Sequence, residues 1–183
     1  RSGARLHLIL PPPNGTVGTT KETLDVIAGL PGVASVEPAN EWDLGGPAAT
    51  WPEEIRAQTR EARAAMRADA KLRRIPLAAP AFGRPGSPLA VGDLTAHVDV
   101  GNSHPYMGGT RPEIPEFPGQ WSLQRHIDTM RAVSGSKPFL ITETGYHTAM
   151  NQTDRQRPVG ADPAAAYVLR TLLEQYRLGA TRT

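Results

Sequence analysis

The chain lacks cysteine, and this absence limits the chemistry it can perform. None of its 183 residues is Cys, which excludes a disulfide framework, a thiolate metal site and a cysteine nucleophile. No run of about 18 apolar residues occurs, so the sequence predicts no membrane span. Aromatic residues make up 5% of the chain, the formal net charge is +2 and no basic run is present. A nucleic-acid partner is therefore not indicated.

Glycine and proline, by contrast, are abundant. The chain has 18 of each, well above the usual ~7% and ~5%. Such a composition predicts many loops between short elements and excludes a helical bundle, while the 39% of hydrophobic residues still suffices for a core. Since α/β barrels usually need about 250 residues, this length fits either one smaller domain or an incomplete larger one.

The order of the expected elements predicts an α/β fold. Apolar runs bounded by Pro and Gly predict strands at 5–10, 33–37, 75–81, 96–100 and 138–142. Amphipathic stretches predict helices at 21–30, 51–74, 121–133 and 162–178. Strands that alternate with helices indicate a parallel sheet with right-handed crossovers.

Polar and aromatic clusters follow three of the five expected strands. These clusters are Asn40-Glu41-Trp42, His104-Pro105-Tyr106 and Glu143-Thr144-Gly145-Tyr146. In parallel α/β proteins the reacting groups lie at the carboxyl ends of strands, so a barrel would bring Glu41 and Glu143 face to face. Glycoside hydrolysis needs such a pair, with one carboxyl protonated to release the leaving group and the other ionised as nucleophile or base.

Each of these residues also has an ordinary structural interpretation. Glu41 fits a helix N-terminus, where the dipole favours an acid, and Asn40 fits a cap or a turn. Glu143 fits a solvated loop, and His104 fits a hydrogen-bonded turn. The aromatic side chains fit packing positions, as aromatic residues most often do: Trp42, Tyr106 and Tyr146.

Three motifs, taken together in order and spacing, resemble a known family. They are Glu37-Pro38-Ala39-Asn40-Glu41, Gly101-Asn102-Ser103-His104-Pro105-Tyr106 and Ile141-Thr142-Glu143-Thr144-Gly145-Tyr146. The resemblance is to the glycoside hydrolases of clan A, the retaining (β/α)8-barrel enzymes that include cellulases, mannanases and β-xylosidases. In that clan an Asn-Glu pair ends the fourth strand, a His-x-Tyr element ends the sixth, and a Glu ends the seventh.

The resemblance implies a role for each matching residue. Glu41 resembles the general acid/base, and Glu143 resembles the nucleophile. The remaining matches lie where the family contacts sugar or steadies the nucleophile: Asn40, Trp42, His104, Tyr106 and Tyr146. Among these, Asn40 is similar to the residue that binds the sugar 2-hydroxyl, and the rings of Trp42 and Tyr146 would stack on pyranose rings. A carbohydrate substrate, no cofactor and a secreted or extracytoplasmic location are also implied.

Only part of the family's barrel is matched. Numbered from Asn40-Glu41, the expected strands are the third to the seventh of a (β/α)8 TIM barrel, and 179–183 looks like the opening of the eighth. We therefore interpret 1–183 as a single partial barrel catalytic domain. Five strands cannot close a barrel and would leave edges open. We expect a piece of a longer enzyme that, expressed alone, aggregates or hydrolyses no glycoside.

Other functions stay open at this point. One is a carbohydrate-binding or cell-surface protein that keeps the barrel loops without catalysis. Another is a complete open α/β domain for a phosphorylated ligand, which ranks last because no glycine-rich phosphate motif occurs. The five His residues lack the close spacing of a zinc-binding helix, so no metal site is predicted. No Gly-x-Ser-x-Gly elbow is present, which argues against an α/β-hydrolase serine.

Overall fold

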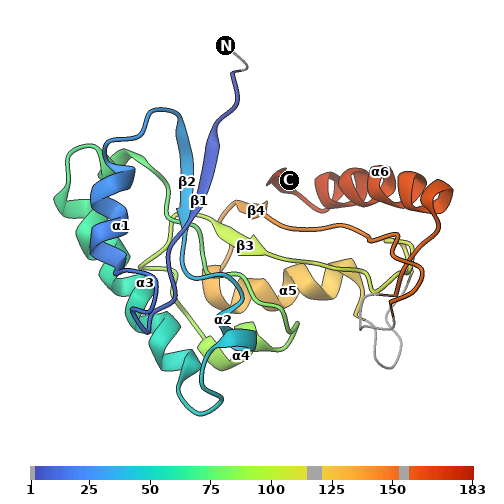
Figure 1. Cartoon of the computed structure of the whole chain (residues 1–183), viewed down its shortest axis with the longest axis horizontal. Helices are drawn as coiled ribbons and strands as arrows, with labels where there is room; N and C mark the ends of the chain where they lie inside the picture. The colour runs from blue at the N-terminus through green and yellow to red at the C-terminus, as the bar shows by residue number, and fades with distance from the viewer. Residues whose placement is uncertain (1–2, 115–120, 153–156) are drawn as a thin grey trace.

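A computed structural model describes residues 3–114, 121–152 and 157–183 of the chain (Figure 1). Its strands are β1 (Leu6–Ile9), β2 (Val33–Glu37), β3 (Gly101–Ser103), β4 (Phe139–Ile141) and β5 (Ala180–Arg182). Its longer helices are α1 (Thr20–Ile27), α3 (Trp51–Ala68), α5 (Leu123–Ser134) and α6 (Ala161–Arg177). All of the strand pairs described are parallel. The predicted α/β class with parallel strands is confirmed.

The strands lie side by side in the order in which they occur along the chain. β1 pairs with β2, and β3, β4 and β5 form a second group. The segment 75–81 joins the two groups through isolated parallel bridges from Leu77 to Val36 and from Ala78 to Val100. Because all strands run the same way, their carboxyl ends lie along one edge. This edge carries the three predicted clusters.

Two of the expected strands differ from the structure. The segment 75–81 forms only the isolated bridges, since Pro76 and Pro80 have no N–H to give to a ladder. The strand expected at 96–100 is wrong, because 95–97 form a turn in which His97 N donates to Leu94 O at 2.8 Å. Pairing starts only at Val100 and continues as β3. At the other end of the chain, β5 forms where the sequence suggested a further strand opening.

The helices mostly follow the predicted stretches. α1 begins with a capping box in which Thr19 and Glu22 bond each other's backbone N–H. α3 is shorter than predicted and ends near Asp69, whose carboxylate accepts the N–H groups of Lys71 and Leu72; a short 3-10 helix, η1 (Leu72–Arg74), follows. Two further short helices, not expected from the sequence, lie in the loops after strands: α2 (Trp42–Gly45) and α4 (Ser87–Val91).

The core behind the strands holds the carboxyl-end loops in place. Helices α1 and α3 pack against each other, and Leu24 of α1, Met66 of α3 and Val36 of β2 belong to one buried apolar cluster. α5 lies along β3 (Figure 1), and its Ile127 packs in a second cluster with Phe139 of β4. α6 is different, because several of its large apolar side chains are exposed: Val168, Leu169, Leu172, Leu173 and Tyr176. Within the described residues, no helix combines the length and the apolar character needed to cross a membrane.

Candidate active site

The ends of β2, β3 and β4 bring three of the predicted residues into contact. Glu41 follows β2, His104 follows β3 and Glu143 follows β4. One carboxylate oxygen of each glutamate and one ring nitrogen of His104 all lie within 4.8 Å of one another. His104 Nδ1 is 3.0 Å from Glu41 Oε1 and 3.8 Å from Glu143 Oε2. Residues far apart in the sequence thus form one cluster, with His104 buried at its base.

Glu41 has an uncommon backbone conformation. Its φ of 42° and ψ of 47° place it in the left-handed region, and it is the one non-glycine residue with positive φ in the described chain. The turn is closed by Leu44 N, which donates to Glu41 O at 2.8 Å as α2 begins. Such a conformation costs on the order of 1–3 kcal/mol and is concentrated at functional sites.

A buried aspartate fixes the short helix α2, which begins directly after Glu41. The Asp43 carboxylate, in α2, accepts hydrogen bonds from Gly83 N at 3.0 Å, Arg84 N at 2.8 Å and Ser87 Oγ at 2.7 Å. These bonds tie α2 to the loop before α4. A Cβ atom on Gly83 would overlap the Leu44 side chain and lie 3.0 Å from Glu41 Oε2, so Gly83 packs closely against both side chains.

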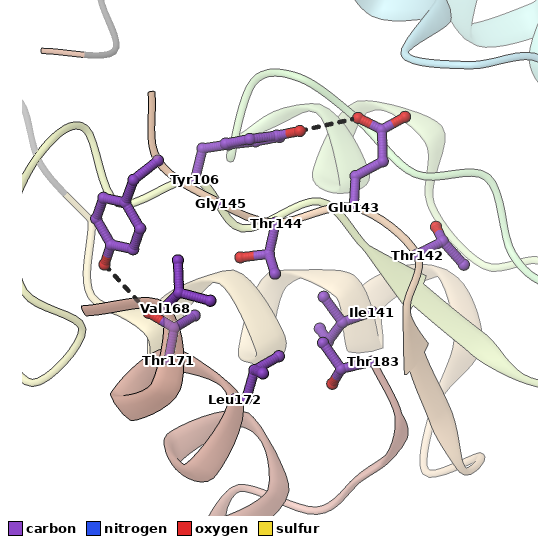
Figure 2. A pocket seen from close by; sticks show the side chains of 11 residues that line it. Tyr106, Ile141, Thr142, Glu143, Thr144, Gly145, Val168, Thr171, Leu172 and Thr183 are labelled. Carbon is purple, nitrogen blue, oxygen red and sulfur yellow. Dashed lines mark hydrogen bonds between the residues drawn. The ribbon is translucent and has the colours of Figure 1, made fainter. Parts of the chain in front are cut away.

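Tyr106 holds the second glutamate. Its hydroxyl donates to Glu143 Oε2 at 3.1 Å, the contact drawn as a dashed line in Figure 2. Burial, reinforced by the nearby charge of Glu143, raises the pKa of Tyr106 to about 12. The hydroxyl therefore remains a donor across the physiological range. The Glu143 side chain is 34% exposed and lines a cavity of about 460 Å³ between the Tyr106 ring and α6, so a ligand can reach it.

A third glutamate is buried beneath the cluster. Glu37, the last residue of β2, is 1% exposed. Its Oε2 accepts hydrogen bonds from His7 Nε2 at 2.7 Å, from Thr142 Oγ1 at 2.8 Å and from Asn102 Nδ2. Thr142 Oγ1 also lies 2.9 Å from His104 Nε2. Glu37 is therefore connected to His104 through one hydroxyl group.

These contacts determine where the protons lie. With Glu37 ionised, the single hydroxyl proton of Thr142 goes to Glu37 Oε2 at 2.8 Å or to Asn102 Oδ1 at 2.9 Å, both of which only accept, so the Thr142 oxygen accepts from His104 Nε2–H. The 3.0 Å contact between His104 Nδ1 and Glu41 Oε1 then needs a proton of its own, since two lone pairs would otherwise face each other. Glu41 and His104 together hold one exchangeable proton.

Comparison with solved structures identifies proteins that share this arrangement of strands and helices. An active-site mutant of Rhizomucor miehei β-1,3-glucanosyltransferase, solved with laminaritriose, matches with a TM-score of 0.65 and 15% identity, over 98% of this chain and 64% of that one. A β-D-glucuronidase of Dictyoglomus thermophilum matches with a TM-score of 0.55 and 18% identity, over 90% of this chain and 28% of that one. The chain has a glycoside-hydrolase-like fold.

This result confirms, at the level of fold, the resemblance predicted from the three motifs. The chain spans less than two thirds of the length of either neighbour. No family model matches its sequence, and no curated protein matches it. The numbering of its strands as third to seventh stays a prediction.

Trp42 does not occupy the place that the sequence suggested within this glycoside-hydrolase-like fold. Its side chain is 5% exposed and packs in the core with Ile55 and Phe82, and its indole N–H donates to Glu54 Oε2 at 2.7 Å. The first turn of α2 directs the ring inward, so neither face is open to a sugar. The prediction that Trp42 stacks on substrate is wrong for this structure.

Asn40 and Tyr146 lie at the margins of the site. Asn40 is exposed in the turn that precedes Glu41. Tyr146 lines the same cavity as Glu143, but its hydroxyl donates to Thr110 O at 2.9 Å and its ring lies 5.5 Å from that of Tyr167. Tyr146 thus forms a fixed part of the cavity wall.

Sequence reasoning missed the residues that support the cluster. Glu37, Asn102 and Thr142 lie in or beside buried strands, and Asp43 lies in a helix too short to be recognised. One signal was present: a charged or amide side chain within a run that is otherwise buried requires partners. That signal identifies Glu37 and Asn102 as members of a buried network but does not identify their partners.

Proposed function

We propose that this chain carries the catalytic centre of a retaining glycoside hydrolase that acts on a β-linked poly- or oligosaccharide. The supporting observation is the approach of the two carboxylates, whose nearest oxygens lie within 4.8 Å. Direct attack on the sugar requires carboxyls about 5–5.5 Å apart, and an intervening water requires about 6.5–9.5 Å. The gap between Glu41 and Glu143 favours direct attack.

In the first step Glu143 is the nucleophile. Tyr106 donates to Oε2 of Glu143, so Oε1 is left to attack the anomeric carbon. Glu41 passes the proton that it shares with His104 to the glycosidic oxygen, and the leaving sugar departs as an alcohol. The bond from the anomeric carbon to the leaving oxygen breaks as the ester bond to Glu143 forms.

In the second step the same groups act in reverse. Glu41, now without its proton, accepts a proton from a water molecule that attacks the anomeric carbon from the face vacated by the leaving sugar. The ester bond to Glu143 breaks, and the carboxylate is restored. Two inversions leave the configuration retained.

The substrate class rests on two supports. The fold is shared with a β-1,3-glucanosyltransferase solved with laminaritriose, and the cavity beside Glu143 carries aromatic rings from Tyr106 and Tyr146, side-chain types suited to contact with sugar rings. We propose a β-glucan or a related β-linked glycan. A secreted or extracytoplasmic location and a single partial (β/α)8-barrel catalytic domain over 1–183 belong to the same proposal.

The stereochemistry of the product tests the mechanism. The intact protein, incubated with laminari-oligosaccharides or other β-linked oligosaccharides, is expected to release the β-anomer first, as followed by proton NMR before mutarotation. Early release of the α-anomer would contradict the retaining assignment. Sugar binding by calorimetry with no hydrolysis of any β-linked glycan tested would instead favour a non-catalytic binding protein.

Tyr106→Phe tests the positioning of the nucleophile. A hydrogen bond to a charged group is worth about 1.5–3 kcal/mol, so its loss is expected to lower kcat by about 10- to 100-fold with little change in KM. Tyr176→Phe is the matched control, because Tyr176 lies on the outer face of α6 and is 79% exposed. Equal kcat values for the two variants would remove Tyr106 from the mechanism.

A further inference from the structure

Glu41, His104 and Glu143 have a second property besides their proposed catalytic roles. Each presents one ligand atom of the kind that divalent transition metals bind, and the three atoms lie within 4.8 Å of one another. Among the described residues this is the one such group of three or more. The sequence did not indicate it, because its members follow three different strands.

The distances suit a small metal ion. Zinc binds imidazole nitrogen at about 2.0–2.1 Å and carboxylate oxygen at about 2.0–2.2 Å, which places neighbouring ligand atoms of a tetrahedral site roughly 3.3–3.5 Å apart. His104 Nδ1 lies 3.0 Å from Glu41 Oε1 and 3.8 Å from Glu143 Oε2, on either side of that value. The third separation, between the two carboxylate oxygens, is no more than 4.8 Å, so binding one ion requires the Glu143 side chain to move toward Glu41.

The surroundings of His104 also suit a metal ligand. The ring is buried, and its Nε2–H donates to Thr142 Oγ1, which in turn donates to Glu37 or Asn102. A metal-binding histidine almost always donates its other N–H in this way, which fixes the ring and directs the free nitrogen at the metal. Here the nitrogen so directed is Nδ1, and it faces both catalytic carboxylates.

We propose that Glu41, His104 and Glu143 form a site for a divalent transition metal such as Zn²⁺, and that the bound metal inhibits the enzyme. The ion takes the place of the proton shared by Glu41 and His104, and its charge is balanced by the two carboxylates. Three protein ligands leave the fourth position of a tetrahedral site open to water. With metal bound, Glu41 has no proton to donate, and the charge of the ion makes the coordinated carboxylate of Glu143 a weaker nucleophile. Hydrolysis and metal binding thus exclude each other.

This site is distinct in kind from a magnesium or calcium site. Those ions take six or more ligands, nearly all oxygen, whereas this cluster offers one buried nitrogen and two carboxylates. Zn²⁺ and Co²⁺ are therefore expected to bind, and Mg²⁺ and Ca²⁺ are not.

Direct binding measurements test the site without reference to any substrate. Calorimetric titration of the metal-free intact protein with ZnCl₂ is expected to show one site, and Co²⁺ is expected to give the intense visible absorption of a four-coordinate complex. Both signals should disappear in Glu143→Gln and in His104→Asn, and Thr142→Val should weaken Zn²⁺ binding by about 10- to 100-fold. His97→Asn, which removes a histidine outside the cluster, should bind like the wild type.

Several outcomes would overturn the proposal. One is that the wild-type protein binds no zinc. Another is that Glu143→Gln binds zinc as strongly as the wild type, which would place the metal elsewhere. Circular dichroism checks that each variant is folded. If His104→Asn does not fold, Glu143→Gln alone tests the metal site, because Glu143 is partly exposed and glutamine has the same shape. Where hydrolysis is measurable, Zn²⁺ is expected to abolish it and a chelator to restore it. Activity that persists in protein saturated with zinc would contradict the proposed inhibition. Zinc binding by a wild-type protein that hydrolyses no glycan would support the metal site and count against the proposed function only.

Discussion

Glu143→Ala is expected to lower turnover by about a thousandfold or more, because no other described carboxylate beside the cavity can form the glycosyl ester. Azide should restore part of the activity. It fits the space left by the side chain and attacks the anomeric carbon directly, so the product is a glycosyl azide of inverted configuration. Glu61→Ala, an exposed glutamate of α3, is the control and should turn over like the wild type.

The Glu41→Ala variant is expected to hydrolyse natural substrates as slowly as the Glu143→Ala variant, but for a different reason. The variant lacks the proton donor, so substrates with activated aryl leaving groups, which need no protonation to depart, should form the ester at nearly the normal rate. Azide then attacks the ester in the second step and gives a glycosyl azide of retained configuration. The opposite configurations from the two variants separate nucleophile from acid/base. Wild-type turnover in either variant would refute the assignment of both roles.

The sequence predicted the parts of this site that follow strands. Glu41, His104, Tyr106 and Glu143 lie in the segments that follow β2, β3 and β4, and the ends of parallel strands lie together at one edge whatever the helices between them do. Their contact in the structure is a consequence of that topology. The same reasoning gave a wrong prediction for Trp42. Strand topology places this residue at the carboxyl edge of the strands, but it does not determine toward which side the short helix α2 directs the ring.

The parts of the fold and of the site that the sequence did not predict depend on contacts between residues far apart in the chain, which no local pattern contains. The isolated bridges at Leu77 and Ala78 leave 75–81 without a regular strand, since prolines interrupt its ladder. β3 begins later than predicted because the apolar stretch before it is taken up by the turn at His97. Neither the bonds from Asp43 to the loop before α4 nor those that meet at Glu37 follow from periodicity, as each joins residues from different elements.

Removing the buried carboxylate of Glu37 should have the largest effect on stability. In Glu37→Leu, the donors that now meet at Oε2 from His7, Asn102 and Thr142 lose their common acceptor while still inside the protein. Leaving a buried donor without an acceptor costs about 1–3 kcal/mol per group. Urea unfolding followed by circular dichroism should show this loss. Glu61→Leu, on the surface of α3, should change the free energy of unfolding by less than about 0.5 kcal/mol.

The conservative variant separates stability from function. Glu37→Gln keeps the size of the side chain but removes its negative charge, so the hydrogen bond from Thr142 to this position is weaker, while Asn102 Oδ1 stays within reach of the same hydroxyl. Thr142, and through it the ring of His104, is then held less firmly toward Glu41. We expect a folded protein whose kcat falls while KM is little changed. An unfolding free energy of Glu37→Leu equal to wild type, or a Glu37→Gln variant with wild-type kcat, would show that this buried network does not control the site above it.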